Sequence, residues 1–287
     1  MTSRAYAYYP GCSLHSTAKE YDVSARLVCE GLGIELYELD GWTCCGASSI
    51  HSASRLLSTA LPARELQLAG RPGLPLAVAC AMCYSRLKLA AHELSDGATK
   101  ELVEEIVGGD LSGTVEVVHL LKVLDGEREA MPLKRSLSSL RVACYYGCLL
   151  VRPCGVLDFD DEENPQTMDR LIEALGARSI EWDFKTECCG ASMPLSRPDI
   201  VLRLSYRILS QAKQLGADCI AVACPMCHSN LDTYQGKIRA KYKGNIELPV
   251  LYFTQLVGLA LGFSPRQLLL NRHFTDPLPM LKARGLV

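Results

Sequence analysis

The sequence predicts an α/β protein made of two homologous Rossmann-like halves, each with a parallel sheet and related to the other by pseudo-twofold symmetry. Three observations lead to this prediction: an internal repeat of about half the chain, short apolar runs typical of buried parallel strands, and helical periodicity between those runs. A chain of 287 residues with 48% hydrophobic content can form one large core or two modest ones.

Three cysteine motifs occur in the same order in both halves. They are Gly-Cys at 11–12 and 147–148, Cys-Cys-Gly at 44–46 and 188–190, and Cys-x-x-Cys at 80–83 and 224–227. The second and third motifs recur after 144 residues and the first after 136, so we expect an eight-residue insertion near 154–163. The charged stretch 125–139 is the expected boundary, which divides the chain into domains 1–137 and 138–287.

Hydrophobic periodicity predicts alternating strands and helices in each half. In the first half these are a strand at 6–9, a helix at 18–32, a strand at 35–39, a helix at 54–68, a strand at 76–79 and a helix at 83–94. In the second half they are a strand at 142–145, a helix at 165–175, a strand at 179–183, a helix at 200–215, a strand at 219–223 and a helix at 227–241. Such alternation is typical of parallel sheets covered by helices.

Composition narrows the possible functions. Thirty basic and 32 acidic residues give a net charge of -2, which offers no electrostatic case for nucleic acid or an acidic membrane surface. The N-terminus shows no signal peptide, and the longest apolar stretch, 248–263, is interrupted by Thr254 and Gln255, so we expect a cytoplasmic protein without a transmembrane segment. Walker and dinucleotide-binding motifs are absent from the sequence.

The fourteen cysteines point to metal rather than disulfides, because a cytosolic chain keeps its thiols reduced. The repeated cysteines follow predicted strands, and the carboxyl ends of parallel strands share one edge of a sheet. Each half should therefore gather five thiols, one more than a structural zinc ion takes. Soft thiolates favour an iron–sulfur cluster, and Gly46 and Gly190 would let the backbone approach it. A zinc-stabilised scaffold without redox activity remains the alternative.

The doubled pattern resembles the CCG-domain (cysteine-rich) family, and within it the B subunit of heterodisulfide reductase. The likeness covers nearly the whole chain and includes Tyr-Tyr-Gly-Cys at 145–148 and Cys-Pro-Met-Cys-His at 224–228. The resemblance implies two [4Fe-4S] clusters of the noncubane form. The ligands it implies are Cys12, Cys44, Cys45, Cys80 and Cys83 for the first cluster, and Cys148, Cys188, Cys189, Cys224 and Cys227 for the second.

The resemblance further implies an oxidoreductase acting on sulfur groups, in which cluster iron captures a substrate sulfur and a disulfide is reduced or formed. The implied partners are the flavin-containing and the ferredoxin-like iron–sulfur subunits of the complex, together with a small thiol or disulfide substrate. An electron-relay subunit of a sulfur-oxidising or quinone-linked complex is the alternative function, because CCG domains occur in such systems too.

Other candidate residues have more ordinary interpretations. His228 follows Cys227 and would be a catalytic proton donor to a leaving thiolate, with a supporting hydrogen bond as its alternative role. His119 lies in an apolar stretch and is expected to be packed with its hydrogen bonds satisfied. Arg152 could attract an anionic substrate or be a surface charge. For Cys154, in the predicted insertion, we expect no role. The remaining cysteines are expected to be small core residues, namely Cys29, Cys144 and Cys219.

Overall fold

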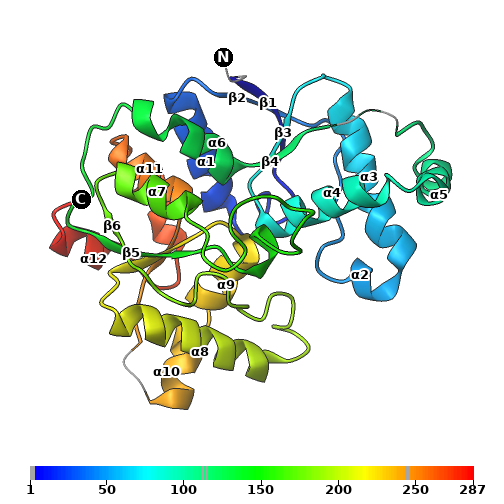
Figure 1. The fold of residues 1–287 in the computed structure, drawn as a ribbon. Helices are drawn as coiled ribbons and strands as arrows, with labels where there is room; N and C mark the ends of the chain where they lie inside the picture. Colours follow the sequence, from blue (N-terminus) through cyan, green and yellow to red (C-terminus); the bar gives the residue numbers. More distant parts are fainter. Residues whose placement is uncertain (1–3, 112, 114, 244–245) are drawn as a thin grey trace.

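The computed structural model describes residues 4–111, 113, 115–243 and 246–287. It contains two four-stranded parallel sheets, with the strand orders β2-β1-β3-β4 and β6-β5-β7-β8 (Figure 1). The orders are equivalent, since the first strand of each half lies between the second and third. The predicted α/β class with two similar halves is therefore confirmed.

The strands of the two halves and the main helices between them follow the same order along the chain. The strands are β1 (Ala5–Tyr9), β2 (Glu35–Glu38), β3 (Leu76–Val78), β4 (Val117–His119), β5 (Arg141–Tyr145), β6 (Arg178–Ser179), β7 (Cys219–Val222) and β8 (Val250–Tyr252). The helices of the first half are α1 (Lys19–Gly31), α2 (Ile50–Ala53), α3 (Arg55–Gly70), α4 (Ala81–Glu93), α5 (Gly97–Val107), α6 (Leu120–Glu127) and the 3₁₀ turn η1 (Arg128–Ala130). Those of the second are η2 (Cys148–Leu150), α7 (Thr167–Ala174), α8 (Pro198–Gln214), α9 (Pro225–Asp232), α10 (Gln235–Tyr242), α11 (Phe253–Ala260), η3 (Leu270–Arg272) and α12 (Leu278–Ala283).

The inner strands β3 and β7 are fully buried, as expected for apolar strands in a parallel sheet. Helix α1 ends where Gly33 adopts a positive φ of 69°, and the N–H of Gly33 donates to the carbonyl of Glu30. The hydroxyl of Ser54 accepts the N–H of Leu57 and so caps α3, at the residue where that helix was expected to begin.

Two predicted elements differ from the structure. The helix predicted at 227–241 is interrupted between α9 and α10, because the buried Gln235 amide donates to the Leu231 carbonyl and pairs with the backbone of Leu248. The strand predicted at 179–183 ends at Ser179. Beyond it, the indole N–H of Trp182 donates to the carbonyl of Cys144. In a longer strand, a backbone N–H would have bonded this carbonyl. The short strands β4 and β8 were not predicted.

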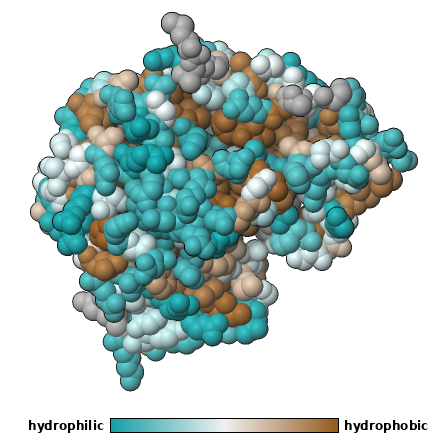
Figure 2. Space-filling view, viewed as in Figure 1, coloured by the Kyte–Doolittle hydropathy of each residue, from teal (hydrophilic) through white to brown (hydrophobic). Residues whose placement is uncertain are grey.

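One continuous core runs through both halves. Helix α1 of the first half packs against α11 of the second, where Tyr21 stacks on Tyr252 with ring centroids 4.1 Å apart and Ser24 hydrogen-bonds Thr254 at 2.7 Å (Figure 1). The apolar stretch 248–263 thus forms β8 and α11 inside the protein. Within the described ranges, every helix is too short or too polar to cross a membrane. The visible face in Figure 2 is largely hydrophilic, with smaller apolar areas between.

A buried ion pair fixes the chain just before the second Cys-Cys motif. The amine of Lys185, only 2% exposed, lies 3.1 Å from Asp169 and donates to the carbonyl of Pro165. The carbonyl of Lys185 accepts the N–H groups of Tyr146 and Gly147, and the hydroxyl of Tyr146 donates to Asp169. This network joins the end of β5 to the segment that carries Cys188 and Cys189.

Replacing Lys185 with methionine should lower the free energy of unfolding by about 3–5 kcal/mol, because the Asp169 carboxylate would stay buried without its cationic partner. Urea unfolding measures this loss. Lys213→Met is the matched control, since its amine is exposed and, among the described residues, donates only to the Glu247 carbonyl at 3.3 Å. It should change stability by about 0.5 kcal/mol or less. Equal effects of the two substitutions would contradict the role given to Lys185.

Candidate metal centre

The parallel topology brings the cysteines of the first half together at the carboxyl ends of its strands. Cys12 follows β1, Cys44 and Cys45 follow β2, and Cys80 and Cys83 flank the start of α4. The sulfur of Cys12 lies 3.7 Å from that of Cys44, and the sulfur of Cys45 lies 3.3 Å from that of Cys83. The thiols of Cys44 and Cys45, and those of Cys80 and Cys83, also hydrogen-bond to each other. All five thiols form one connected group.

The second half repeats this arrangement. The sulfurs of Cys189 and Cys227 are 3.7 Å apart, and the thiol of Cys148 hydrogen-bonds to that of Cys188. Cys224 is the N-cap of α9 and its thiol hydrogen-bonds to Cys227. The structure thus places all ten predicted residues in two groups of five, while their assignment as cluster ligands remains a prediction.

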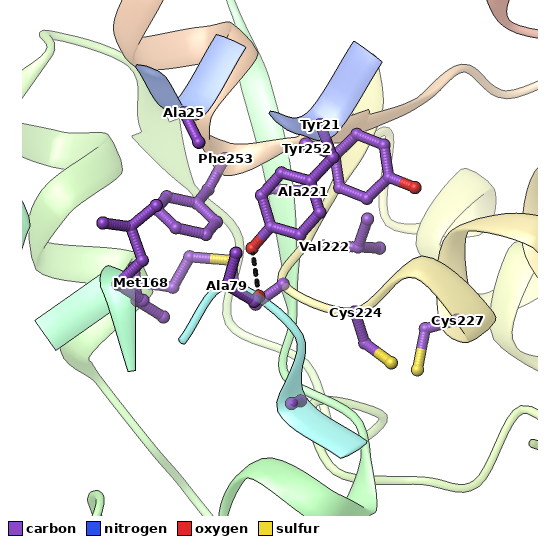
Figure 3. Packing of buried hydrophobic residues seen from close by; sticks show 14 of the residues in the cluster. Tyr21, Ala25, Ala79, Met168, Ala221, Val222, Cys224, Cys227, Tyr252 and Phe253 are labelled. Atoms are coloured by element: carbon purple, nitrogen blue, oxygen red, sulfur yellow. Dashed lines mark hydrogen bonds between the residues drawn. The ribbon is translucent and has the colours of Figure 1, made fainter. Parts of the chain in front are cut away.

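The two thiol groups meet at the seam between the halves. Cys80 and Cys224 lie close enough for each thiol to shift the pKa of the other, and the N–H of Ala81 donates to the carbonyl of Ala223 at 3.3 Å. Figure 3 shows Cys224 and Cys227 beside the hydrogen bond from the Tyr21 hydroxyl to the carbonyl of Ala79. Because Cys80 and Cys224 are both helix N-caps, the positive ends of two helix dipoles favour negative charge at the seam.

Tyrosines hold the two Cys-Cys motifs in place. The hydroxyl of Tyr9 donates to the carbonyl of Thr43 at 2.7 Å and accepts the N–H of Cys45 at 2.9 Å. In the second half, the hydroxyl of Tyr145 donates to the carbonyl of Glu187 at 2.5 Å. The Tyr-Tyr pair that precedes each Gly-Cys motif is visible in the sequence, so the repeat itself could have revealed this role.

Two glycines leave space beside the sulfurs of the Cys-x-x-Cys motifs. Gly11 and Gly147 have φ angles of 74° and 68°, and a Cβ on either would lie 3.1 Å from the sulfur of Cys83 or 3.0 Å from that of Cys227. The N–H of Gly46 donates to the sulfur of Cys44 at 3.5 Å, and the expected approach of this backbone to a cluster stays a prediction. The missing side chain of Gly46 serves packing instead, because a Cβ would be 2.9 Å from Leu61.

Hydrogen bonds among the thiols distribute their protons unequally. The bond from Cys148 lowers the pKa of Cys188 to about 6. Bonds from Cys44 and Cys83 hold the pKa of Cys45 well below its usual value, and bonds from Cys227 and Cys80 do the same for Cys224. A lowered pKa favours the thiolate, which is the form that binds soft metals.

The two groups differ in exposure. Cys12 and Cys44 are exposed, whereas Cys148 and Cys188 are half-buried. A narrow cavity reaches the second group, and Met82 from α4 of the first half lines it. Five thiols around each site, with small residues beside them, fit a multi-iron cluster better than a four-coordinate ion.

His228 lies in a buried network rather than at an open site. Its Nε2 is 3.0 Å from the Val250 carbonyl and 2.9 Å from Nδ1 of His273, and its ring stacks on Tyr252 at 4.4 Å. Burial lowers the pKa of His228 to about 4. These contacts favour a supporting role, and the catalytic role stays a proposal. Asp232 lies close to both histidines, but its oxygens accept the N–H groups of residues 274 and 275.

The remaining predicted residues lie mostly as expected. Burial raises the pKa of Cys29 to about 12, and Cys144 and Cys219 are also buried. Cys154 is exposed. Arg152 is exposed, and its guanidinium donates to the hydroxyl of Thr186 at 3.5 Å. His119 is packed as expected: its Nδ1 accepts the N–H of Leu121 at 3.2 Å, and hydrogen bonding to the backbone of Ala79 and Ala223 opposes the lowering of its pKa to about 4 by burial.

Acid should destabilise the protein through His273. Burial holds its pKa at about 3, whereas in the unfolded chain it takes up a proton near pH 6.5. The unfolded state thus binds more protons below pH 6.5, and stability falls with decreasing pH. Between pH 7 and pH 5, the free energy of unfolding should therefore fall by about 1–2 kcal/mol less in His273→Asn than in the wild type. Urea unfolding at each pH measures this, with the exposed His92→Gln as control, and an unchanged pH slope in His273→Asn would refute it.

Comparison with known proteins agrees with the doubled cysteine pattern. A family model for the CCG cysteine-rich domain matches residues 6–88 and 142–232, one segment in each half. A solved structure of a hypothetical protein from Helicobacter pylori superposes with a TM-score of 0.80 at 17% identity. It covers 96% of this chain, which spans about half of that structure (53%), and the likeness concerns the fold alone.

Three relatives match along almost the whole chain. An 8-methylmenaquinol:fumarate reductase membrane anchor subunit from Wolinella succinogenes is 35% identical over 95% of this chain and 98% of its own length. The B subunit of a ferredoxin:CoB-CoM heterodisulfide reductase from Methanosarcina mazei is 32% identical over 94% of each chain. A protein from Archaeoglobus profundus, named as similar to heterodisulfide reductase B subunits, is 30% identical over 91% of this chain and 92% of its own. The chain therefore belongs to the CCG cysteine-rich domain family, with heterodisulfide reductase B subunits among its relatives.

Proposed function

We propose that this protein is the catalytic iron–sulfur subunit of a heterodisulfide-reductase-like complex, which reduces or forms a small disulfide. The coarser conclusion, an iron–sulfur redox subunit that works within a complex, follows from its family and relatives. The observation that carries the finer proposal is the convergence of ten thiols into two adjacent groups of five.

Each group would hold one noncubane [4Fe-4S] cluster. The first would use Cys12, Cys44, Cys45, Cys80 and Cys83, and the second Cys148, Cys188, Cys189, Cys224 and Cys227. When bound, such clusters supply single electrons and iron sites with an affinity for sulfur. Two clusters side by side match the two electrons that a disulfide requires.

The residues of this chain prepare the site in three ways. Tyr9 and Tyr145 fix the Cys-Cys motifs by hydrogen bonds, so the sulfurs need little rearrangement. Gly11 and Gly147 leave space beside the sulfurs of the Cys-x-x-Cys motifs. The buried second group lies behind Met82, which limits water there, while the exposed Cys12 leaves the first group open to a substrate or partner.

The proposed setting is a cytoplasmic complex with one flavin-containing subunit and one ferredoxin-like iron–sulfur subunit. A reducing compartment would keep the fourteen cysteines free, as they are in the structure. We also propose that the chain divides into domains 1–137 and 138–287, since the irregular segment between η1 and β5 contains that boundary.

A second candidate function is electron relay in a quinone-linked complex. The relative with 35% identity, named as a subunit of an 8-methylmenaquinol:fumarate reductase, favours it. Turnover of disulfides by the oxygen-free complex with an artificial reductant would support the first function. Oxidation of a quinol without disulfide turnover would support the second.

Protein purified without oxygen should contain about eight iron and eight sulfide per chain, as two four-iron clusters require. Cys45→Ser should lose about half of both, because it removes a ligand from one group only. Cys154→Ser, at an exposed cysteine outside both groups, is the control and should keep full iron. Zinc in place of iron would show that the chain is a zinc-stabilised scaffold.

A glycine substitution tests the geometry of the second group. Gly147→Ala should reduce iron bound there, because its Cβ would lie 3.0 Å from the sulfur of Cys227. Gly155→Ala is a matched control for backbone strain, since Gly155 has a similar φ of 73° with no atom within 4 Å of a Cβ. Equal iron contents of the two variants, measured by colorimetric assay, would mean that space beside Cys227 is not needed.

A further inference from the structure

An open cavity of about 470 Å³ lies between α4, β4, the start of α6 and the segment 155–159. Its volume is within the range of small-molecule sites. Its walls include Tyr84 and Lys88 of α4 and Lys122 of α6. No cysteine is among the described residues that line it, so the cavity is separate from the two thiol groups.

Three of the wall residues have counterparts at the same positions of the second half. They stand one and five places after the Cys-x-x-Cys motif, and three places after the last strand of the sheet. The pairs are Tyr84 and His228, Lys88 and Asp232, and Lys122 and Gln255. The surroundings of these positions can therefore be compared between the two halves.

In the second half, the segment 273–275 covers all three positions. The ring of His273 places its Nδ1 2.9 Å from Nε2 of His228 and its Nε2 2.9 Å from the amide nitrogen of Gln255. The carboxylate of Asp232 accepts the N–H groups of the next two residues of the segment at 2.7 and 2.9 Å. Each of the three side chains thus has a partner within the chain.

In the first half, the segment 155–159 covers the equivalent positions less completely. The hydroxyl of Tyr84 donates to the carbonyl of Leu157 at 2.8 Å, and the amine of Lys122 donates to the carbonyl of Phe159 at 2.9 Å. Lys88 is half-buried and has neither a hydrogen bond nor an ion pair with a described residue. The cavity is the space that the segment leaves beside these side chains.

The charge at the central position is reversed between the halves. Asp232 is an acceptor and binds backbone N–H groups, whereas Lys88 at the equivalent position is a donor only. A partner of Lys88 must therefore offer acceptors, and an anion offers the strongest ones. Glu116 and Asp158 also line the cavity, but they are exposed, so water and salt screen their charges more than that of half-buried Lys88.

The rest of the wall is apolar and firmly packed. It includes Val117 and Val118 of β4 and Phe159 of the covering segment. Phe159 packs edge-to-face on Tyr84 and on His119, with ring centroids 6.1 and 5.9 Å apart. Such a preformed apolar wall beside a few polar groups is typical of a site for a small organic molecule.

We propose that this cavity binds a small organic anion, with a carboxylate or phosphate group at Lys88 and Lys122 and an apolar body against Val117 and Phe159. The site goes beyond the proposed function, because it uses none of the ten cysteines and needs no cluster.

Isothermal titration calorimetry on the full chain, purified without oxygen, tests the site with three probes at constant ionic strength. Benzoate and phenyl phosphate carry the two kinds of anionic group, and benzamide is their neutral analogue. At least one of the two anions should bind saturably at one site per chain. Benzamide should bind at least about tenfold more weakly, because it lacks the charge that strengthens a hydrogen bond to lysine. The tighter of the two anions identifies the group that the site prefers.

Substitutions of opposite sign show where the anion binds. Lys88→Met should weaken binding about tenfold, since a hydrogen bond to a charged group is lost. Lys88→Asp, which introduces the residue of the second half, should abolish binding. Glu116→Gln should bind the anion at least as tightly as the wild type, because it removes a negative charge from the wall. Lys213→Met, at an exposed lysine of the other half, is the control and should bind like the wild type.

Loss of folding does not confuse this test, because Lys88 has no partner among the described residues that its replacement would leave unpaired. Lys88→Gln, which keeps a polar head without the charge, is a second variant, and circular dichroism checks the fold of each. Absence of saturable binding of both anions would overturn the inference. Equal affinities of the wild type and both neutral Lys88 variants would overturn it too. Neither result would affect the proposed function, which iron content tests separately.

Discussion

The meeting of the two halves where Cys80 and Cys224 begin their helices, joined by the hydrogen bond from the N–H of Ala81 to the carbonyl of Ala223, is the constraint on which the rest of the structure depends. Each cysteine follows the third strand of its half and caps the next helix, so equivalent topologies bring both to one seam. The stacking of α1 on α11 and the backbone hydrogen bond from Ala81 to Ala223 hold that seam closed. Displacing one half would separate the central thiols, so the core and the metal centre stabilise the same arrangement.

The symmetry of the fold does not make the two sites equal. The first group has exposed sulfurs, and the second lies under a helix of the other half. Lys185 and Asp169 support the second Cys-Cys motif, whereas Glu65 supports the first by accepting both the N–H and the hydroxyl of Thr43. The exposed first group can therefore contact a substrate or partner, while the second group is shielded from solvent.

The features that were predictable from the sequence are those whose residue motifs occur in both halves. The cysteine motifs and the apolar runs between them were enough to predict two parallel sheets and a meeting point for the thiols. It did not predict β4 and β8, which are three residues long and carry unlike residues at equivalent positions, His119 and Tyr252. Hydrogen bonds from Gln235 interrupt one predicted helix and a hydrogen bond from Trp182 shortens one predicted strand, and such tertiary contacts leave no periodic signal in the sequence.

Anomalous diffraction at the iron absorption edge, from crystals grown without oxygen, tests the central claim most directly. The account predicts two separate multi-iron peaks, one within each group of five sulfurs, on either side of the Cys80–Cys224 contact. A single metal ion in either group, or iron located away from these ten cysteines, would contradict it.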